Sequence, residues 1–74
     1  MQDIIRQKLE AEFPGDPIEI NGSYSDGAHI EVIITSARFK NLSIIDQHRL
    51  INETLKDFLQ NGTIHALKIK TRTP

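Results

Sequence analysis

The histidines are the residues of this chain whose chemistry reaches beyond packing. There are three, His29, His48 and His65, and there is no cysteine, so thiolate chemistry and disulfides are excluded. A neutral imidazole can bind metals and transfer protons near neutral pH. Residue type and position alone favour a structural, hydrogen-bonded role for His65, because it shares a strand face with Leu67 and Ile69.

Catalytic groups in a known arrangement are absent from the sequence. It has no cysteine nucleophile, no serine–histidine–acid set, no phosphate-binding glycine loop and no helical metal-binding motif. The acids Glu10, Glu12, Glu53 and Asp57 occupy positions typical of solvated helix surfaces. We therefore expect a protein that is not an enzyme.

Length and composition predict a single domain over residues 1–74. Hydrophobic residues make up 38% of these 74 residues and charged residues 26%, which is enough for one small core. Such a core rarely supplies more than about 3–5 kcal/mol, which favours stabilisation by a partner or ligand. The lack of cysteine and of an apolar leader or membrane-length run predicts a cytoplasmic location and no membrane association.

Hydrophobic spacing predicts a helix over residues 2–13, ended by the proline- and glycine-rich residues 14–17. Its apolar stripe consists of Ile4, Ile5, Leu9 and Phe13. Alternating residues then predict two strands, joined into an antiparallel hairpin by the polar turn of residues 21–27. The apolar faces of these strands contain Ile18 and Ile20 in the first, and Ile30, Val32 and Ile34 in the second.

A longer helix and a third strand are predicted in the second half. Ser43 and Asp46 approximate a capping box for a helix that runs to about Gln60 and stops at Asn61-Gly62. Its buried stripe is expected to contain Ile44, His48, Ile51, Leu55 and Phe58. We expect His48 to orient the preceding turn, residues 38–43, by hydrogen bonding. The third strand is predicted over residues 64–71, with His65, Leu67 and Ile69 on one face.

The order of elements is helix, strand, strand, helix and strand, with a turn or short extra helix around residues 38–42. This order predicts an α+β fold of the class II KH-like type, in which a three-stranded sheet carries its helices on one face. The connection through the long helix is long enough for a crossover, which permits parallel pairing of the second and third strands and a mixed sheet.

Several motifs together resemble the BolA family. They are HIEVIITS at 29–36, Arg38-Phe39, Ser43, Gln47-His48-Arg49-Leu50, Ile64-His65-Ala66-Leu67 and Thr71-Arg72-Thr73-Pro74. The resemblance covers essentially the whole chain. At two positions the chain departs from the family pattern: Asn41 replaces a glycine, and Gln47 replaces the first arginine of Arg-His-Arg. Because asparagine tolerates left-handed backbone angles, we expect the turn at Asn41 to be preserved.

The resemblance implies a partner and a cofactor. It implies binding to a monothiol glutaredoxin and a [2Fe–2S] cluster shared with that protein and glutathione, with no cofactor in the isolated chain, which is expected to be a monomer or weak homodimer. By resemblance, His65 of Ile-His-Ala is a cluster ligand. The second ligand stays open; its candidate is His29, the histidine nearest to the loop where the family places a cysteine or histidine. Imidazole ligation raises the reduction potential above that of all-cysteine clusters.

The alternative function is nucleic-acid binding by a transcriptional regulator, which the resemblance and the KH-like topology also suggest. Residues 1–36 hold seven acids and two bases (−5), and residues 37–74 hold three acids and seven bases (+4). The candidate phosphate-contacting residues are Arg38, Lys40, Arg49, Lys68, Lys70 and Arg72. Against this function, the net charge is −1, there are only three Phe and one Tyr, and no Gly-x-x-Gly clamp is found.

Overall fold

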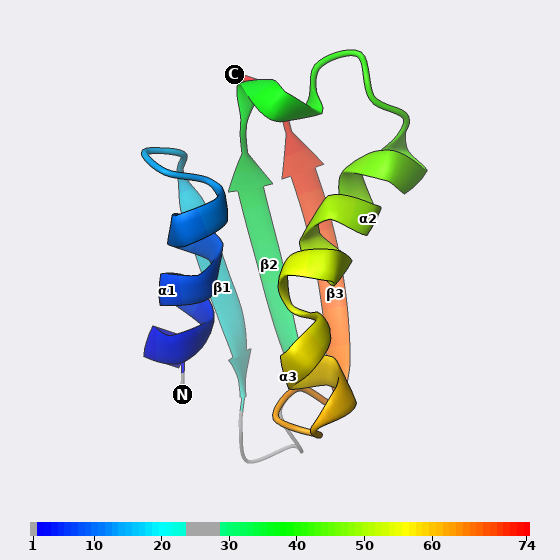
Figure 1. The fold of residues 1–74 in the computed structure, drawn as a ribbon. Helices are drawn as coiled ribbons and strands as arrows, with labels where there is room; N and C mark the ends of the chain where they lie inside the picture. Colours follow the sequence, from blue (N-terminus) through cyan, green and yellow to red (C-terminus); the bar gives the residue numbers. More distant parts are fainter. Residues whose placement is uncertain (1, 24–28) are drawn as a thin grey trace.

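The chain forms one three-stranded sheet and a layer of short helices (Figure 1). A computed structural model describes residues 2–23 and 29–74. In chain order the elements are α1 (Gln2–Glu12), β1 (Ile18–Ser23), β2 (His29–Thr35), the 3-10 helix η1 (Ala37–Phe39), α2 (Ile44–Thr54), α3 (Lys56–Gln60) and β3 (Ala66–Arg72).

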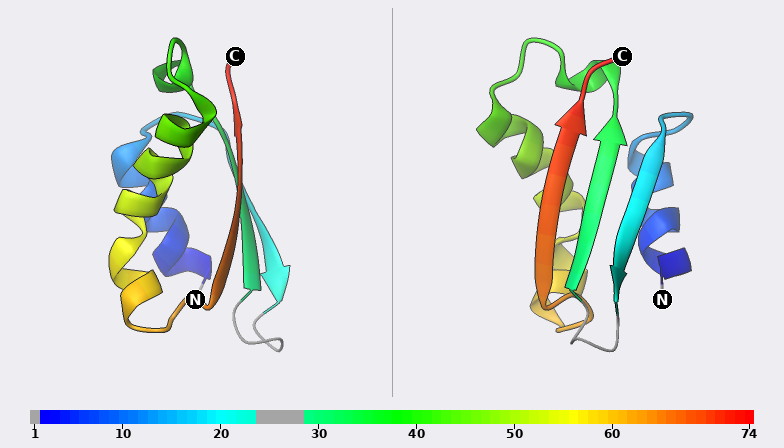
Figure 2. Two further views of the ribbon diagram at one scale, coloured as in Figure 1. Left: turned by 90° about the vertical axis from the view of Figure 1, so that its right-hand side faces the viewer. Right: turned by 180° about the vertical axis from the view of Figure 1, so that it is seen from behind.

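The sheet has the order β1-β2-β3 and is mixed. β1 and β2 pair antiparallel, with Ile18 opposite Ile34, whereas β2 and β3 pair parallel, with His29 opposite Ala66. The parallel pairing follows from the long crossover through η1, α2 and α3. The helices cover one face of the sheet, and the described residues leave the outer face open (Figure 2). The predicted fold class and order of elements are confirmed.

The core lies between the sheet and the helices. Along β2, Ile30, Val32 and Ile34 are buried, and the residues between them point to the outer face, so the predicted alternation is confirmed. The other buried apolar residues are Ile5, Leu9, Phe13, Ile20, Phe39, Ile51, Leu55 and Ile64. Burial of apolar area, at roughly 25 cal/mol per Å², is the main force that holds the layers together.

α1 packs on the sheet, and its C-terminal end is bound by an arginine that is distant in sequence. Three of its four predicted apolar positions are buried, but Ile4 is 52% exposed and lies outside the core. Arg38 donates from Nη1 to the Glu12 carbonyl oxygen (2.6 Å) and from Nη2 to the Glu12 carboxylate (3.0 Å). Its guanidinium also lies 4.8 Å from the ring centroid of Phe13. A cation here is stabilised by the helix dipole and the aromatic face.

β1 is longer than the sequence predicted. Residues 21–23 were expected in the turn but continue the pairing with β2. Gly22 makes this possible, because its φ is +151° and a Cβ there would lie only 2.4 Å from the His29 carbonyl oxygen. A side chain at this position would therefore push the two strands apart. The rest of the expected turn, residues 24–28, lies outside the described residues.

The connection between β2 and α2 follows the local sequence signals. The Ser36 hydroxyl accepts a hydrogen bond from the Arg38 N–H (3.1 Å) and caps η1, which is the short extra helix that we expected. Asn41 has φ of 68°, so the asparagine takes the left-handed conformation expected of it. The Ser43 hydroxyl accepts from the Asp46 N–H (3.1 Å) and caps α2.

The long helix predicted over residues 43–60 is divided into α2 and α3. The break falls at Leu55, which has φ of −101° and ψ of 10° and is nevertheless fully buried. Just before it, the Thr54 hydroxyl donates to the Leu50 carbonyl oxygen (2.8 Å), and such bonds compete with the helical ladder. The predicted continuous helix is therefore wrong at this point.

The predicted buried stripe of this helix also needs correction. Ile44 is 62% exposed and His48 only partly buried, whereas Gln47, Ile51 and Leu55 face the core. The first turn of α2 extends beyond the sheet, so an apolar side chain there has no layer to pack against (Figure 1). Spacing alone could not show where the sheet beneath the helix ends.

β3 begins two residues later than predicted. Ile64 is buried and His65 is exposed, but both precede the strand, which starts at Ala66. Leu67 and Ile69 face the helices, while Lys68 and Lys70 are exposed on the outer face, as the alternation predicted. In residues 2–23 and 29–74, no helix has both the length and the apolar character needed to cross a bilayer.

Candidate functional site

His65 is presented by a backbone that is held on both sides. Immediately before it, the buried Ile64 donates its N–H to the Phe58 carbonyl oxygen at the end of the helical layer (3.0 Å). Immediately after it, Ala66 enters β3 and pairs with His29 of β2. The histidine therefore has a fixed position in the chain, although its side chain is exposed.

The turn before His65 leaves room for its ring. Gly62 has φ of +82°, and a Cβ at this position would lie 3.8 Å from His65 Nε2, in ordinary contact. The Asn61 side chain accepts a hydrogen bond from the Thr63 N–H (2.9 Å) and shapes the turn. Within residues 2–23 and 29–74, His65 makes no side-chain hydrogen bond or ion pair. Among these residues, its ring nitrogens have no polar partner.

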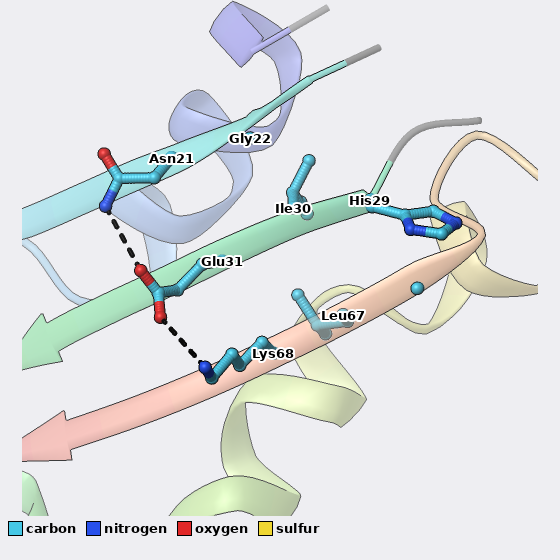
Figure 3. A pocket seen from close by; sticks show the side chains of 8 residues that line it. Asn21, Gly22, His29, Ile30, Glu31, Leu67 and Lys68 are labelled. Carbon is cyan, nitrogen blue, oxygen red and sulfur yellow. Dashed lines mark hydrogen bonds and ion pairs between the residues drawn. The ribbon is translucent and has the colours of Figure 1, made fainter. Parts of the chain in front are cut away.

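The second candidate ligand, His29, lies at the same end of the sheet. It is the first residue of β2, is exposed, and is opposite Ala66 in the parallel register. Its ring points beyond the start of the strand and away from Glu31 (Figure 3). The register thus brings His29 and the residue after His65 onto neighbouring strands, although 35 residues separate the two histidines in sequence.

Next to His29, the outer face of the sheet carries a polar row centred on Glu31. Asn21 Nδ2 donates to Glu31 Oε1 (3.3 Å), and Lys70 and Lys68 lie 3.5 Å and 3.9 Å from Oε2. The hydrogen bond from Asn21, followed by the charges of Lys70 and Lys68, lowers the pKa of Glu31 below its ordinary value of 4.5. The Glu31 carboxylate therefore stays ionised, and the row of polar side chains links all three strands.

A shallow hollow of about 370 Å³ lies between this polar row and the end of the sheet (Figure 3). It is lined by Asn21, Gly22, His29, Ile30, Glu31, Ala66, Leu67 and Lys68. One imidazole, one carboxylate and one ammonium group therefore border the same concave surface. Of its two lining groups that could bind a metal, the Glu31 carboxylate is engaged by Asn21, Lys68 and Lys70, whereas the imidazole of His29 is exposed.

Comparison with known proteins assigns the family. The family model described as BolA-like protein matches residues 7–74. The chain belongs to the BolA family. A BolA-like protein of Dictyostelium discoideum is 57% identical over 81 residues, which cover 100% of this chain and 71% of that protein. The resemblance inferred from the motifs is thereby confirmed.

Solved BolA structures agree with the fold. The BolA domain of SufE1 from Arabidopsis thaliana superposes with a TM-score of 0.86 at 33% identity, covering 97% of this chain and 90% of that one. BolA1 from the same plant gives a TM-score of 0.77 at 34% identity, covering 97% and 89%. A Vibrio cholerae relative, 38% identical over 80 residues and covering 99% of this chain and 74% of its own, is named a DNA-binding transcriptional regulator.

In this BolA chain, Gln47 performs the structural role that we expected of His48. Its Nε2 donates to the carbonyl oxygens of Phe39 (3.1 Å) and Leu42 (3.0 Å), and its Oε1 accepts from the Thr71 hydroxyl. Gln47 is buried, and His48 makes no side-chain hydrogen bond among the described residues. The helical spacing of Gln47, Ile51 and Leu55 could have revealed this side chain, but its polarity excluded it from the predicted stripe.

The basic residues proposed for nucleic-acid contact do not form one surface of this BolA fold. Arg38 binds Glu12 at the end of α1, and Arg49 lies 3.4 Å from Asp46 on α2. Lys40 is exposed after η1. The remaining three, Lys68, Lys70 and Arg72, alternate along β3 and share its outer face.

Proposed function

We propose that this chain is a non-enzymatic adaptor that binds a monothiol glutaredoxin and donates imidazole to a [2Fe–2S] cluster shared with that partner and glutathione. The observation that carries the proposal is His65: an exposed ring on a backbone fixed by Ile64 and Ala66. A ligand offered to another molecule needs both accessibility and a defined position, and His65 has both.

The residues present suit a shared cluster better than one held by this chain alone. Within the described parts of the chain, no group of three or more His, Cys, Asp or Glu side chains could hold a metal ion. The chain also has no cysteine, the usual cluster ligand. His65 and His29 at one end of the sheet supply at most two ligands, so thiols from outside would complete the set.

The two histidines have separate roles in this proposal. His65 would be the constant ligand, because its position is set by the buried Ile64 on one side and by the strand pairing of Ala66 on the other. His29 would be the second ligand from the neighbouring strand. When bound, a cluster with imidazole ligation supplies one-electron redox chemistry at a higher potential than its all-cysteine counterpart. The residues of this chain then contribute ligation and orientation and exchange no covalent bonds with a substrate.

Reconstitution with a glutaredoxin tests the proposal. The chain, a monothiol glutaredoxin, glutathione, ferrous iron and sulfide are mixed anaerobically, and the visible absorption and circular dichroism spectra are compared with those of glutaredoxin alone. We expect a changed spectrum that His65→Ala abolishes. His48→Ala, which removes a histidine from the other end of the helical layer, serves as the matched control and retains the changed spectrum.

The His29→Ala variant distinguishes the two ligand sets. A spectrum altered relative to the parent complex would assign the second ligand to His29, whereas an unchanged spectrum would remove His29 from the site. The same spectrum and affinity for His65→Ala and the parent would refute the adaptor proposal. Far-ultraviolet circular dichroism of each variant verifies that the fold is intact.

DNA binding is the second candidate, favoured by the name of the Vibrio cholerae relative and by the three basic side chains on β3. Glu31 opposes it, because it pairs with two of these three cations, Lys68 and Lys70. If the outer face binds DNA, Lys68→Gln combined with Lys70→Gln reduces gel retardation at low salt. Retardation unchanged by this double substitution would remove the face as a DNA site.

A further inference from the structure

The chain contains two Asn-Gly dipeptides, Asn21-Gly22 and Asn61-Gly62. An asparagine side chain deamidates when the backbone nitrogen of the following residue attacks its amide carbon, Cγ. Glycine favours this step, because it has no side chain to shield the nitrogen and it leaves the backbone free to rotate. Both dipeptides therefore carry the same reactive groups, and their surroundings determine which of them reacts.

The first dipeptide is held within the sheet. Asn21 and Gly22 lie in β1 and pair with Glu31 and Ile30 of β2. The Asn21 side chain donates from Nδ2 to Glu19 (2.8 Å) and to Glu31 (3.3 Å). Bringing the Gly22 nitrogen to Asn21 Cγ would require β1 to open. The two carboxylates also oppose the negative charge that develops during the attack.

The second dipeptide lies in the turn between α3 and β3. Asn61 directly follows α3, with φ of −89° and ψ of 1°, and both Asn61 and Gly62 are exposed. In residues 2–23 and 29–74, the Gly62 N–H donates to no backbone carbonyl. The Gly62 nitrogen can therefore turn toward the Asn61 side chain without losing a hydrogen bond of its own or separating two strands.

The side-chain carbonyl of Asn61 is also polarised. Its Oδ1 accepts a hydrogen bond from the Thr63 N–H (2.9 Å). This oxygen becomes negative when Cγ is attacked, and a donor at such a distance stabilises an oxyanion. The hydrogen bonds of the Asn21 side chain to Glu19 and Glu31 are instead made by Nδ2. The structure thus favours attack at Asn61 over attack at Asn21.

The reaction needs only water as a co-reactant. The Gly62 nitrogen loses its proton and bonds to Asn61 Cγ, the bond from Cγ to Nδ2 breaks, and ammonia leaves. Water then opens the resulting succinimide at one of its two carbonyl carbons. Opening at Cγ gives aspartate, and opening at the main-chain carbonyl carbon gives isoaspartate. In sum, asparagine and water give an acid and ammonia, without oxidation or reduction.

We propose that Asn61 is a modification site at which the chain deamidates spontaneously, and that isoaspartate formed there displaces the ring of His65. Gly62 lies against this ring, because a Cβ on Gly62 would be 3.8 Å from His65 Nε2. Isoaspartate adds one main-chain carbon immediately before Gly62 and therefore moves this contact. The modification is independent of the proposed function, and only its consequence for cluster ligation rests on that function.

Ageing the full chain at mildly alkaline pH, both folded and in urea, tests the site. Peptide mass spectrometry locates the deamidation, and methylation by a protein isoaspartyl methyltransferase detects the isoaspartate. In the folded chain we expect Asn61 to react about ten-fold or more faster than Asn21, because Asn21 reacts only when β1 opens. In urea the two rates should converge. Asn61→Gln is the control, because a glutamine would have to form a larger ring.

Two results of this experiment would overturn the modification site. They are a folded chain in which Asn21 reacts as fast as Asn61 or faster, and a folded chain in which neither asparagine reacts.

Nuclear magnetic resonance of the free chain tests the effect on His65. Ageing the parent should shift the ring resonances of His65 and leave those of His48, at the other end of the helical layer, in place. Ageing Asn61→Gln should shift neither. Fresh Asn61→Asp carries the new charge without the extra main-chain carbon, so its His65 resonances should move less than those of the isoaspartate form.

Unchanged His65 resonances in the isoaspartate form would refute the displacement, as would an equal shift in Asn61→Asp, which would assign the change to charge alone. No glutaredoxin or cluster is present in these measurements. Their outcome therefore does not depend on the reconstitution with His65→Ala, and failure of either proposal can be recognised separately.

Discussion

At the residue scale, the Gln47 side chain joins three separate parts of the fold. Its amide binds two carbonyl oxygens of the β2–α2 connection and the Thr71 hydroxyl of β3. Because it is buried, removing it leaves polar groups without partners and opens a cavity. We predict that Gln47→Ala lowers the free energy of unfolding by about 2–3 kcal/mol in urea denaturation.

Asn52→Ala is the control for this loss, since Asn52 is exposed on the same helix. It should change the free energy of unfolding by less than about 0.5 kcal/mol. Equal effects of the two substitutions would show that the Gln47 hydrogen bonds are replaced by water at no cost.

Gly22 is the second residue whose identity is dictated by its surroundings. Its φ of +151° and the 2.4 Å approach of a Cβ to the His29 carbonyl oxygen both exclude other residues. We predict that Gly22→Ala lowers the free energy of unfolding by about 3 kcal/mol or more, because β1 and β2 must separate. Thermal and urea denaturation measure this.

Gly15 provides the matched comparison. Its φ is +78°, but a Cβ there meets nothing within 4 Å. Gly15→Ala should therefore cost only the left-handed strain of about 1–2 kcal/mol. A Gly22→Ala variant no less stable than Gly15→Ala would show that the strands tolerate a side chain at position 22.

At the scale of the elements, Glu31 links the three strands across the outer face. Its pKa is lowered by Asn21, Lys70 and Lys68, so its stabilising effect is fully present above its ordinary value of 4.5 and is lost as pH falls through the lowered value. We predict that the difference in unfolding free energy between the parent and Glu31→Gln is constant near neutral pH and shrinks in acid. Urea denaturation at several pH values measures it.

Glu10→Gln removes an exposed carboxylate of α1. It controls for the general effect that the loss of one carboxylate has on the free energy of unfolding in acid. The prediction fails if the difference between the parent and Glu31→Gln is the same at pH 3 and at pH 7. Such a result would mean that the row of side chains does not favour the ionised carboxylate.

The elements also show which features the sequence could reveal. Periodicity identified the inner face of β2, and the Ser43 cap and the left-handed Asn41 followed from local chemistry. The burial of Ile44 was predicted wrongly, because it depends on how far the sheet extends beneath α2. Spacing also missed the break at Leu55, which directly follows the hydrogen bond from the Thr54 hydroxyl to the Leu50 carbonyl oxygen.

The candidate site, too, was only partly predictable from the sequence. The motif around His65 marked that residue, and the structure exposes it. The shared location of His29 and His65 could not be read from the sequence, because it depends on the parallel register of β2 and β3. Hydrophobic alternation predicted both strands, but it left open whether they pair parallel. The ligand roles of both histidines stay predictions.

For the whole molecule, folding brings the acidic first half and the basic second half of the chain together. Arg38 pairs with Glu12, and Lys68 and Lys70 pair with Glu31. Ion pairs within the fold thus neutralise part of the charge asymmetry between the two halves of the sequence. Fewer cations remain for a polyanion than the composition suggests.

The ion pairs of Glu31 determine how strongly we expect the chain to bind DNA. A phosphate backbone must compete with Glu31 for Lys68 and Lys70, so the parent should show little retardation at any salt concentration. Glu31→Gln removes the competing carboxylate and should increase retardation at low salt, with the gain lost by about 150 mM salt. Gel retardation across a salt series measures both proteins. Strong retardation of the parent that persists at the highest salt would contradict this prediction, because it would require phosphate contacts that the Glu31 pairs do not restrain.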